Sequence, residues 1–546
     1  MAKSKVYNNL VGSARKAKYP AVQGSELSVN MYPGKNGQQV YMESLPGIKN
    51  FVELGGKCRG CYVSTIGLKT LASSEDLFVA MGNKLWRVDA SGNKTMLGTI
   101  ASNSGRVSFA ESGGPRALLL IVDGANMYYY DLLEGGQLKQ IQLPQRINDN
   151  GGTITPTHVA VVAGSIVVND SGSGFVYYSQ AYPLNNEKRQ MFDIVNGEVQ
   201  YEDDGVTVKM VEVDSDKHVF EDNYGAQQYF SGESSSDNVN AVFAVGPTLY
   251  VFGPKSVDVF QRGSGDYEDW IRTSYTVTNT FGLEAPNSLA SIGGSVYFIA
   301  SGQQYGKCVM RVTGTQFEKI SEDWLDEKLL QENTTSAYGM AYSVGEHQFY
   351  CLQLNAIGET WCVDSLDMGW HQRASRNQVT GQLSQWRVGG IAYYREKFWA
   401  FTVDGMMDEF QRDYWYEDYA DGTKKPMVRI RETNVITDNL RPFTFEEMTI
   451  ECNTGTQKNY NPVSSNPADV DKYMLKVLLN VSKDGGMTWG NTRTAYFGNK
   501  GEYSHRVRFM NIGYARLCVI RVTFSEPMDF VMTACSIRAE ATAEEI

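Results

Sequence analysis

Few residues of this 546-residue chain have the types and spacing that chemistry requires. Cys58 and Cys61 form its one CxxC pair, whereas a structural zinc site needs four ligands, usually two such pairs or one pair with two histidines. The five histidines, at positions 158, 218, 347, 371 and 505, lie far apart in the sequence. We therefore expect no metal site and no cofactor, and we expect the eight cysteines to be buried or half-buried free thiols.

Catalytic motifs are also missing from the sequence. It contains no Walker A loop, no GxSxG elbow and no HExxH helix. The adjacent carboxylates Glu322 and Asp323, and likewise Glu417 and Asp418, could supply a general acid and base. In strand-rich sequence such pairs are more typical of a solvated edge that blocks unwanted sheet pairing. The sequence therefore predicts no catalytic residues and favours a protein that is not an enzyme.

One motif is shared with enzymes. Ser482, Asp484, Gly486, Thr488 and Trp489 match the Asp-box, S-x-D-x-G-x-T-W, which recurs in sialidase propellers. Its Ser and Asp side chains bind turn backbone, its Gly adopts a reversed φ, and its Trp packs under the hairpin. Sialidases carry several copies in successive blades, but this chain carries one, placed after its repeats. We predict a structural turn here; a carbohydrate-active propeller, either sialidase or lectin, stays the alternative.

The elements that position these residues are mainly strands. Between about Asp76 and Asp413 seven units repeat a hydrophobic run, a turn and an aromatic-rich run, and most recur every roughly 40 to 50 residues, the length of a four-stranded propeller blade. The turns fall at Gly82-Asn83, Asp123-Gly124, Gly164, Gly246-Pro247, Gly293-Gly294, Gly345-Glu346 and near Arg395. The pattern predicts an all-β chain with a β-propeller of six or seven blades; two ordinary β-sandwiches are the alternative.

The expected domains are an N-terminal arm over residues 1–50, the propeller over 51–422, and an antiparallel β-sandwich domain over 423–546, apart from the propeller. The N-terminal arm or its first strand is expected to complete the propeller ring. An acidic, Ser-rich insertion is expected near residues 185–237, and the best helix candidate is Glu322–Gln331. The sandwich strands are predicted at Met448–Cys452, Met474–Val481, His505–Met510, Cys518–Phe524 and Phe530–Arg538.

The charge balance is acidic, with 50 basic against 62 acidic residues and a net charge of -12. A protein that grips DNA through phosphates normally shows a basic excess, so we expect no tight DNA binding. The basic residues near the start, Lys3, Lys5, Arg15, Lys16 and Lys18, predict a contact arm or a frayed terminus. The longest apolar run, Ala117–Val122, is too short to span a bilayer, so no membrane-spanning segment is expected.

The order of many short blocks resembles that of the packaged-DNA stabilisation proteins of short-tailed bacteriophages. Individually the blocks are ordinary turn sequences, and their order and number make the match specific. In the first part of the chain they are Asn30–Pro33, Leu45–Ile48, Arg59-Gly60, Gly82–Asp89, Leu97–Ile100, Ser104–Ser108 and Val122–Gly124. Near the end they are Asp484–Trp489, Gly501–Tyr503, Arg506–Arg508, Gly513, Ala515-Arg516, Ser525–Pro527 and Cys535–Arg538.

This resemblance implies a structural virion protein, the hub or nozzle of the tail. The expected free thiols indicate assembly in the reducing host cytoplasm. The resemblance also implies a homo-oligomeric ring, usually a hexamer, below the portal and the head-to-tail adaptor. Such a ring closes the DNA exit channel with a tail needle or plug, retains the packaged DNA and later conducts it during ejection, with tailspikes or fibres docked nearby. It encloses double-stranded DNA without sequence-specific binding. The resemblance supplies no catalytic residues.

Overall fold

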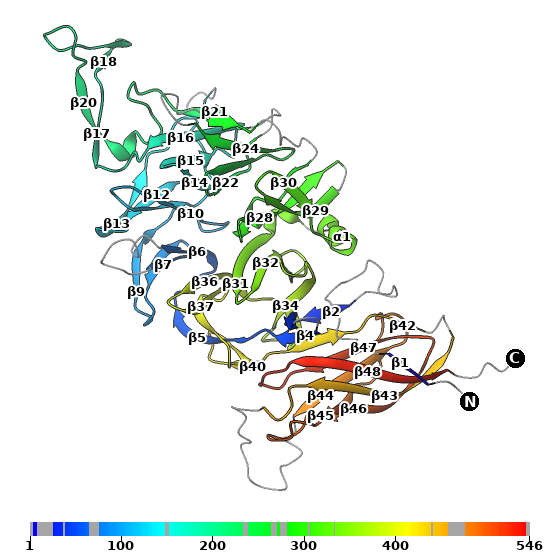
Figure 1. Ribbon diagram of the computed structural model, residues 1–546. Coiled ribbons are helices and arrows are strands. Elements are labelled where there is room, and N and C mark those ends of the chain that lie inside the picture. Colours follow the sequence, from blue (N-terminus) through cyan, green and yellow to red (C-terminus); the bar gives the residue numbers. More distant parts are fainter. Residues whose placement is uncertain are drawn as a thin grey trace.

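The computed structural model describes residues 4–7, 26–36, 39–64, 76–147, 152–232, 238–263, 270–273, 281–303, 306–331, 333–437, 441–456 and 475–541. Of the basic residues near the start, only Lys5 lies within these ranges, and Ser234–Asp237 of the expected insertion lies outside them. Strands dominate the fold, as expected (Figure 1). None of the helices in these ranges has the length and apolar character needed to cross a membrane.

Seven sheets, almost entirely antiparallel, follow one another along the chain as blades of a β-propeller (Figure 1). The first four blades are simple meanders of consecutive strands, except that an insertion separates the last two strands of the third. Blade 1 contains β6 (Cys58–Ser64), β7 (Asp76–Met81), β8 (Lys84–Val88) and β9 (Lys94–Thr99); blade 2 contains β10 (Ser108–Ser112), β11 (Leu118–Val122), β12 (Met127–Asp131) and β13 (Gly135–Ile141); blade 3 contains β14 (Val159–Val162), β15 (Ser165–Asn169), β16 (Phe175–Ala181) and β21 (Tyr229–Ser231); blade 4 contains β22 (Ala241–Val245), β23 (Thr248–Phe252), β24 (Val257–Arg262) and β25 (Trp270–Arg272).

Blades 5 to 7 add extra strands to the same plan. In blade 5 two short strands, β26 and β27, both pair with β28 and together form its first strand. Blade 5 contains β26 (Phe281–Leu283), β27 (Ala290–Ile292), β28 (Ser295–Gly302), β29 (Gly306–Thr313) and β30 (Gln316–Lys319); blade 6 contains β31 (Tyr338–Val344), β32 (His347–Leu354), β33 (Glu359–Asp364), β34 (Trp370–Arg376) and β35 (Leu383–Gln385); blade 7 contains β36 (Val388–Tyr394), β37 (Lys397–Thr402), β38 (Met406–Gln411), β39 (Tyr416–Asp418), β40 (Lys424–Pro426) and the N-terminal β5 (Gly47–Glu53).

The N-terminal segment completes the seventh blade, as predicted. Strand β5 pairs with β38, with Phe410 opposite Ile48 and Gln411 opposite Gly47. Gly47 is required there, because a Cβ on it would lie 2.3 Å from the carbonyl oxygen of Tyr416. The expected domain boundary at residues 50/51 falls inside this strand.

Seven hydrophobic clusters lie between successive blades and hold the propeller together. The first and last blades share one of them, in which Leu77 and Val79 of β7 pack with Trp399 and Phe401 of β37. The other six join blades 1 and 2, 2 and 3, 3 and 4, 4 and 5, 5 and 6, and 6 and 7. Because each blade buries both of its faces in this way, some middle strands are buried along their whole length, as β11 and β15 are.

An eighth cluster is the core of the C-terminal β-sandwich, to which N-terminal strands contribute Met31 and Met42. One sheet of the sandwich contains β1 (Ser4–Tyr7), β3 (Met31–Asn36), β4 (Gln39–Ser44), β43 (Phe443–Cys452), β46 (Val507–Ala515) and β48 (Met532–Ala541). The other contains β41 (Arg429–Glu432), β42 (Ile436–Thr437), β44 (Lys476–Ser482), β45 (Arg493–Tyr496) and β47 (Leu517–Phe524). These strands confirm the five segments predicted from the alternating pattern, with some ends shifted by a few residues, and Met474 of the second segment lies outside the described residues.

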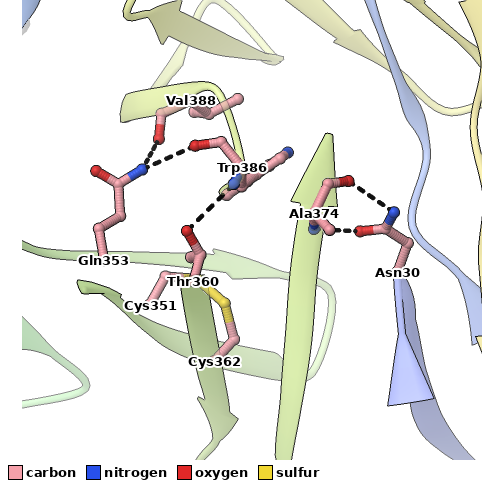
Figure 2. Close-up of a disulfide and its surroundings, with 8 residues drawn as sticks. All are labelled: Asn30, Cys351, Gln353, Thr360, Cys362, Ala374, Trp386 and Val388. Atoms are coloured by element: carbon pink, nitrogen blue, oxygen red, sulfur yellow. Dashed lines mark hydrogen bonds between the residues drawn. A yellow bond between two sulfur atoms is a disulfide. The ribbon is translucent and has the colours of Figure 1, made fainter. Parts of the chain in front are cut away.

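The sandwich does not lie apart from the propeller, so that expectation is wrong. Strand β2 (Leu27–Val29) pairs with β34 of blade 6 on one side and with β41 of the sandwich on the other, which makes one continuous sheet. Asn30, which follows β2, is buried and has a positive φ of 55°. Its amide donates to the carbonyl of Ala374 at 2.8 Å and accepts from the Ala374 N–H at 2.9 Å (Figure 2). The same amide donates to the carbonyl of Val428 at 2.9 Å. This one side chain therefore ties both parts of the fold together.

The insertion of blade 3 is a β-ribbon that projects from the molecule at the upper left of Figure 1. It contains β17 (Lys188–Phe192), β18 (Ile194–Val195), β19 (Glu198–Val199) and β20 (Met210–Asp214), whereas Tyr229–Ser231 of the expected insertion form β21 of the blade itself. The ribbon exposes several large apolar side chains, among them Ile194, Val195, Val206 and Met210. The predicted helix is confirmed as α1 (Asp323–Gln331), which packs Trp324, Leu325 and Leu329 into the cluster between blades 5 and 6.

Candidate functional site

The Asp-box residues form the turn that follows β44 in the sandwich. Asp484 Oδ1 accepts hydrogen bonds from the N–H groups of Met487 and Thr488 at 3.0 and 2.9 Å, and from the Ser482 hydroxyl at 2.6 Å. The Ser482 hydroxyl in turn accepts from the Gly486 N–H at 2.8 Å. Gly486 has a φ of 97°, a conformation that other residues rarely adopt.

Trp489 at the end of the box packs on a cation rather than in a ligand pocket. The guanidinium carbon of Arg521, on the neighbouring strand β47, lies 3.8 Å from the Trp489 ring centroid. The hydroxyl groups of Ser482 and Thr488 bond Asp484 and hold the pKa of its carboxyl well below the usual range. All of these bonds stay within the turn, which favours the structural role predicted for the box.

Replacing Asp484 with Ala is expected to lower the thermal midpoint only slightly, since the carboxylate is exposed and water can replace its bonds. Because its pKa is depressed in the folded state, its contribution is present above the ordinary Asp pKa and is lost as the pH falls through the depressed value. Differential scanning fluorimetry checks this, with Lys483→Ala in the same turn as control. A fluorogenic sialoside should stay uncleaved by every variant. Turnover by the parent protein would refute the structural role.

Two arginines occupy the centre of the propeller, where the first strands of the blades meet. Arg59, only 3% exposed, donates to the carbonyls of Gly82, Ser102, Ser104 and Gly105 at 2.6 to 2.9 Å and so joins the loops of blades 1 and 2. Arg59, Gly82, Ser104 and Gly105 belong to the blocks whose order carries the family resemblance, whereas Ser102 lies outside those blocks. Taken singly the blocks are ordinary turn sequences, so nothing in them predicted this shared network.

Arg106 reaches from blade 2 to the opposite side of the ring. Its Nη1 donates to the carbonyls of Leu289 and Gly339, in blades 5 and 6, at 3.0 and 2.7 Å. Its guanidinium also lies 4.9 Å from the ring centroid of Tyr338, whose hydroxyl donates to the carbonyl of Arg59 at 3.3 Å. Side chains from opposite blades therefore meet across the centre of the propeller.

The packing at the centre of the propeller also sets the protonation state of a histidine. His158 of blade 3 is buried, and burial together with the Arg106 charge lowers its pKa to about 3, so the imidazole is neutral at physiological pH. An anionic substrate at this position would need free donors, but the bonds of Arg59 and Arg106 described above end on backbone carbonyls. The centre of the propeller therefore works as a structural core.

The two carboxylate pairs differ from each other. Glu322 and Asp323 lie at the start of α1, whereas Glu417 and Asp418 are 2% and 4% exposed, so the expectation of a solvated edge is wrong for the second pair. Glu417 accepts from the Ser375 hydroxyl at 2.6 Å and from the Arg376 N–H at 3.2 Å. Burial raises the pKa of the Glu417 carboxyl. The pair is buried because β39 packs between β5 and β40 rather than at a free sheet edge.

The expectation that all eight cysteines are free thiols is wrong for two of them. Cys351 of β32 and Cys362 of β33 are directly opposed in the strand register, with their Cα atoms 4.1 Å apart, and form a disulfide (Figure 2). Near it the Gln353 amide donates to the carbonyls of Trp386 and Val388 at 3.1 and 2.7 Å (Figure 2). The other six cysteines are free. Within the described ranges no three His, Cys, Asp or Glu side chains gather to hold a metal ion.

Comparison with known proteins gives two family matches. Residues 16–398 match the model described as bacteriophage P22 Gp10, beta-propeller, and residues 429–540 match the model described as bacteriophage P22 Gp10, beta-sandwich. No curated protein matches the sequence.

Solved structures that resemble this one are distant. Virginiamycin B lyase from Staphylococcus aureus is 9% identical with a TM-score of 0.37, over 66% of this chain and 97% of the lyase chain. The extracellular domain of a one-component system from B. thetaiotaomicron is 11% identical with a TM-score of 0.39, over 90% of this chain and 60% of the other. Likenesses this weak carry no argument about function.

Proposed function

Because this chain belongs to the bacteriophage P22 Gp10 family, whose propeller and sandwich models both match it, we propose that it is the hub or nozzle of a phage tail. In this role the protein forms a ring below the portal and the adaptor, helps to retain packaged DNA and conducts it during ejection. The observation that carries the proposal is the pair of matches, which together extend from residue 16 to residue 540. The proposed parts of the chain are an N-terminal arm over residues 1–50, the propeller over 51–422 and the sandwich over 423–546, with β3 and β4 of the arm joining the sandwich and β5 completing blade 7.

The filled centre of the propeller supports a ring of several copies. Arg106 bonds carbonyls of blades 5 and 6 from blade 2, so DNA has no path along the axis of a single propeller. A DNA channel must then lie between copies of the chain. Head-to-tail contacts close into a ring when the rotation between neighbours suits the copy number. We propose a homohexamer that contacts the adaptor, a tail needle or plug, and tailspikes or fibres.

The same protein is proposed to act without catalysis. Its central arginines bond backbone carbonyls, and the bonds of its Asp-box end within the turn. Its location is proposed to be the virion tail after assembly in the host cytoplasm. The six free thiols agree with assembly in a reducing compartment. The Cys351–Cys362 disulfide does not follow this pattern.

Electron microscopy tests the ring directly. The purified protein alone is expected to be mostly monomeric, and addition of preassembled adaptor rings is expected to give six-fold particles, because a preformed ring raises the local concentration of subunits. The control is the adaptor ring alone. Particles of another symmetry would contradict the hexamer, and absence of any ring at all protein concentrations would contradict the hub.

Binding to random duplex DNA is expected to be weak or undetectable at physiological salt, because a net charge of -12 opposes phosphate contact. A gel shift with a labelled duplex measures this, with a basic DNA-binding protein as positive control. A dissociation constant below about 1 μM, the tight end of ordinary non-specific binding, would contradict a channel wall that DNA slides past.

A further inference from the structure

A cleft of about 710 Å³ lies where the propeller meets the sandwich. It is bounded by the β3–β4 hairpin, by the β31–β32 turn of blade 6, by the segment that follows β38 in blade 7, and by Asp529 and Val531 of the sandwich. Two parts of the fold and the N-terminal segment therefore build it together. Of the motifs singled out in the sequence, it contains the repeat turn Gly345-Glu346, Tyr32 and Pro33 of the block that begins at Asn30, and Leu45 and Pro46 of the next block.

The walls of the cleft are aromatic, and their side chains pack against one another. Tyr32 lies edge-on to His347 and Phe349, with ring centroids 5.0 and 5.2 Å apart. Behind this wall the buried guanidinium of Arg373 packs on the rings of Tyr32 and Phe349. The aromatic residues of the lining are Tyr32, Tyr41, Tyr342, Phe349, Phe398, Phe410 and Trp415. Such faces attract cations, best where water is excluded.

Carboxylates outnumber basic groups in the lining. The five carboxylates are Glu43, Glu346, Asp367, Asp413 and Asp529, and the basic side chains are Lys35, Arg412 and His347. His347 already bonds Asp364 at 2.5 Å. Burial raises the pKa of Asp529; the Arg429 charge opposes this shift, and the charges of Glu43 and Asp413 add to it. The acidic groups are thus close enough to repel one another, and a positive charge between them would relieve the repulsion.

Two polar atoms in the wall have no hydrogen-bond partner among the described residues. They are the hydroxyl of Tyr342, a residue only 6% exposed, and Oδ2 of Asp367. An ionised carboxylate oxygen can only accept, so a ligand that satisfies Asp367 must bring an N–H or O–H donor. Leaving such atoms buried and unpaired is costly, which distinguishes this cleft from a merely acidic surface.

We propose that this cleft binds an extended basic segment of a partner protein and places a lysine or arginine side chain between the carboxylates and the aromatic walls. The ammonium or guanidinium group supplies the donors and the charge, and the aliphatic stem lies on the rings. An uncharged sugar would leave the carboxylates repelling one another, and a nucleic acid would bring like charge to them. The inference adds a partner site to the proposed hub but does not depend on ring formation, so it is testable on the single subunit.

Isothermal titration calorimetry of the full chain with deca-lysine and deca-arginine tests the proposal, with deca-glutamate and a neutral glucan hexasaccharide as the other probes. Saturable binding of the two cationic peptides is expected. The double variant Glu346→Gln, Asp413→Asn is expected to weaken it about tenfold, since two ion pairs are lost. Both residues are exposed, so the variant should fold. The matched control is Glu198→Gln, Asp203→Asn, which removes equal charge from the exposed ribbon and should change affinity less than about twofold.

The Tyr342→Phe variant distinguishes an effect on peptide binding from an effect on protein stability. It removes only the unpaired hydroxyl, so the thermal midpoint should stay equal or rise while peptide affinity falls. Equal losses of peptide affinity in the two double variants would show general attraction to an acidic protein and would overturn the proposal. Lack of saturable cationic binding, or tighter binding of deca-glutamate or the hexasaccharide, would overturn it as well.

Discussion

Particles assembled without this protein are expected to fill with DNA and then to lose it, so that infectivity falls to background. The proposed ring completes the exit gate below the adaptor, and tightly packed DNA pushes outward because its phosphates repel one another. The measurement is the DNA retained per purified head and the number of infectious particles after deletion of the gene. The protein supplied from a second gene copy should restore both values.

The deletion experiment also distinguishes the proposed tail hub from the alternative function, a carbohydrate-active propeller. A carbohydrate-active propeller would leave DNA retention unchanged and impair only attachment to the host. Heads that stay full and infectious without the protein would show that it is not the closure proposed above. Empty heads that regain DNA only with the intact chain would support it.

Arg59→Ala is expected to lower the free energy of unfolding of the propeller by about 3 to 5 kcal/mol, the range for loss of a buried charged network. Arg59 is buried and donates to Gly82, Ser102, Ser104 and Gly105, so its removal leaves several carbonyls without donors between blades 1 and 2. Arg59→Lys should also be strongly destabilising, because a single ammonium cannot reach acceptors arranged around a planar guanidinium.

Denaturant unfolding followed by tryptophan fluorescence measures this loss, with the exposed Arg516→Ala as control, expected to change stability by less than about 0.5 kcal/mol. The sandwich and the propeller share a sheet, so a single transition is expected for both. Equal stability of the Arg59→Ala and Arg516→Ala variants would show that the stability of the propeller does not depend on the hydrogen bonds of Arg59.

The sequence alone determined the local structure of this protein. Turn residues such as Gly82, with a φ of 57°, mark where one strand ends and the next begins, and short apolar runs between such turns, such as Leu118–Val122, indicate buried strands. The spacing of these hairpins predicted a propeller, and alternation after Thr423 predicted the sandwich. The helix at Asp323–Gln331 was predictable for the same reason, since its signals lie within a few residues.

Only the tertiary structure decided which distant segments meet. Asn30 bonds Ala374, which is 344 residues away, and β5 pairs with β38 more than three hundred residues later. The same holds for the burial of Glu417 and for Arg106 across the propeller. Local sequence sets backbone conformation, the alternation of faces and the register within each hairpin, but which strands far apart in the chain pair depends on closing the whole ring. The cleft between the propeller and the sandwich also depends on that closure, because its walls come from segments that lie far apart in the sequence.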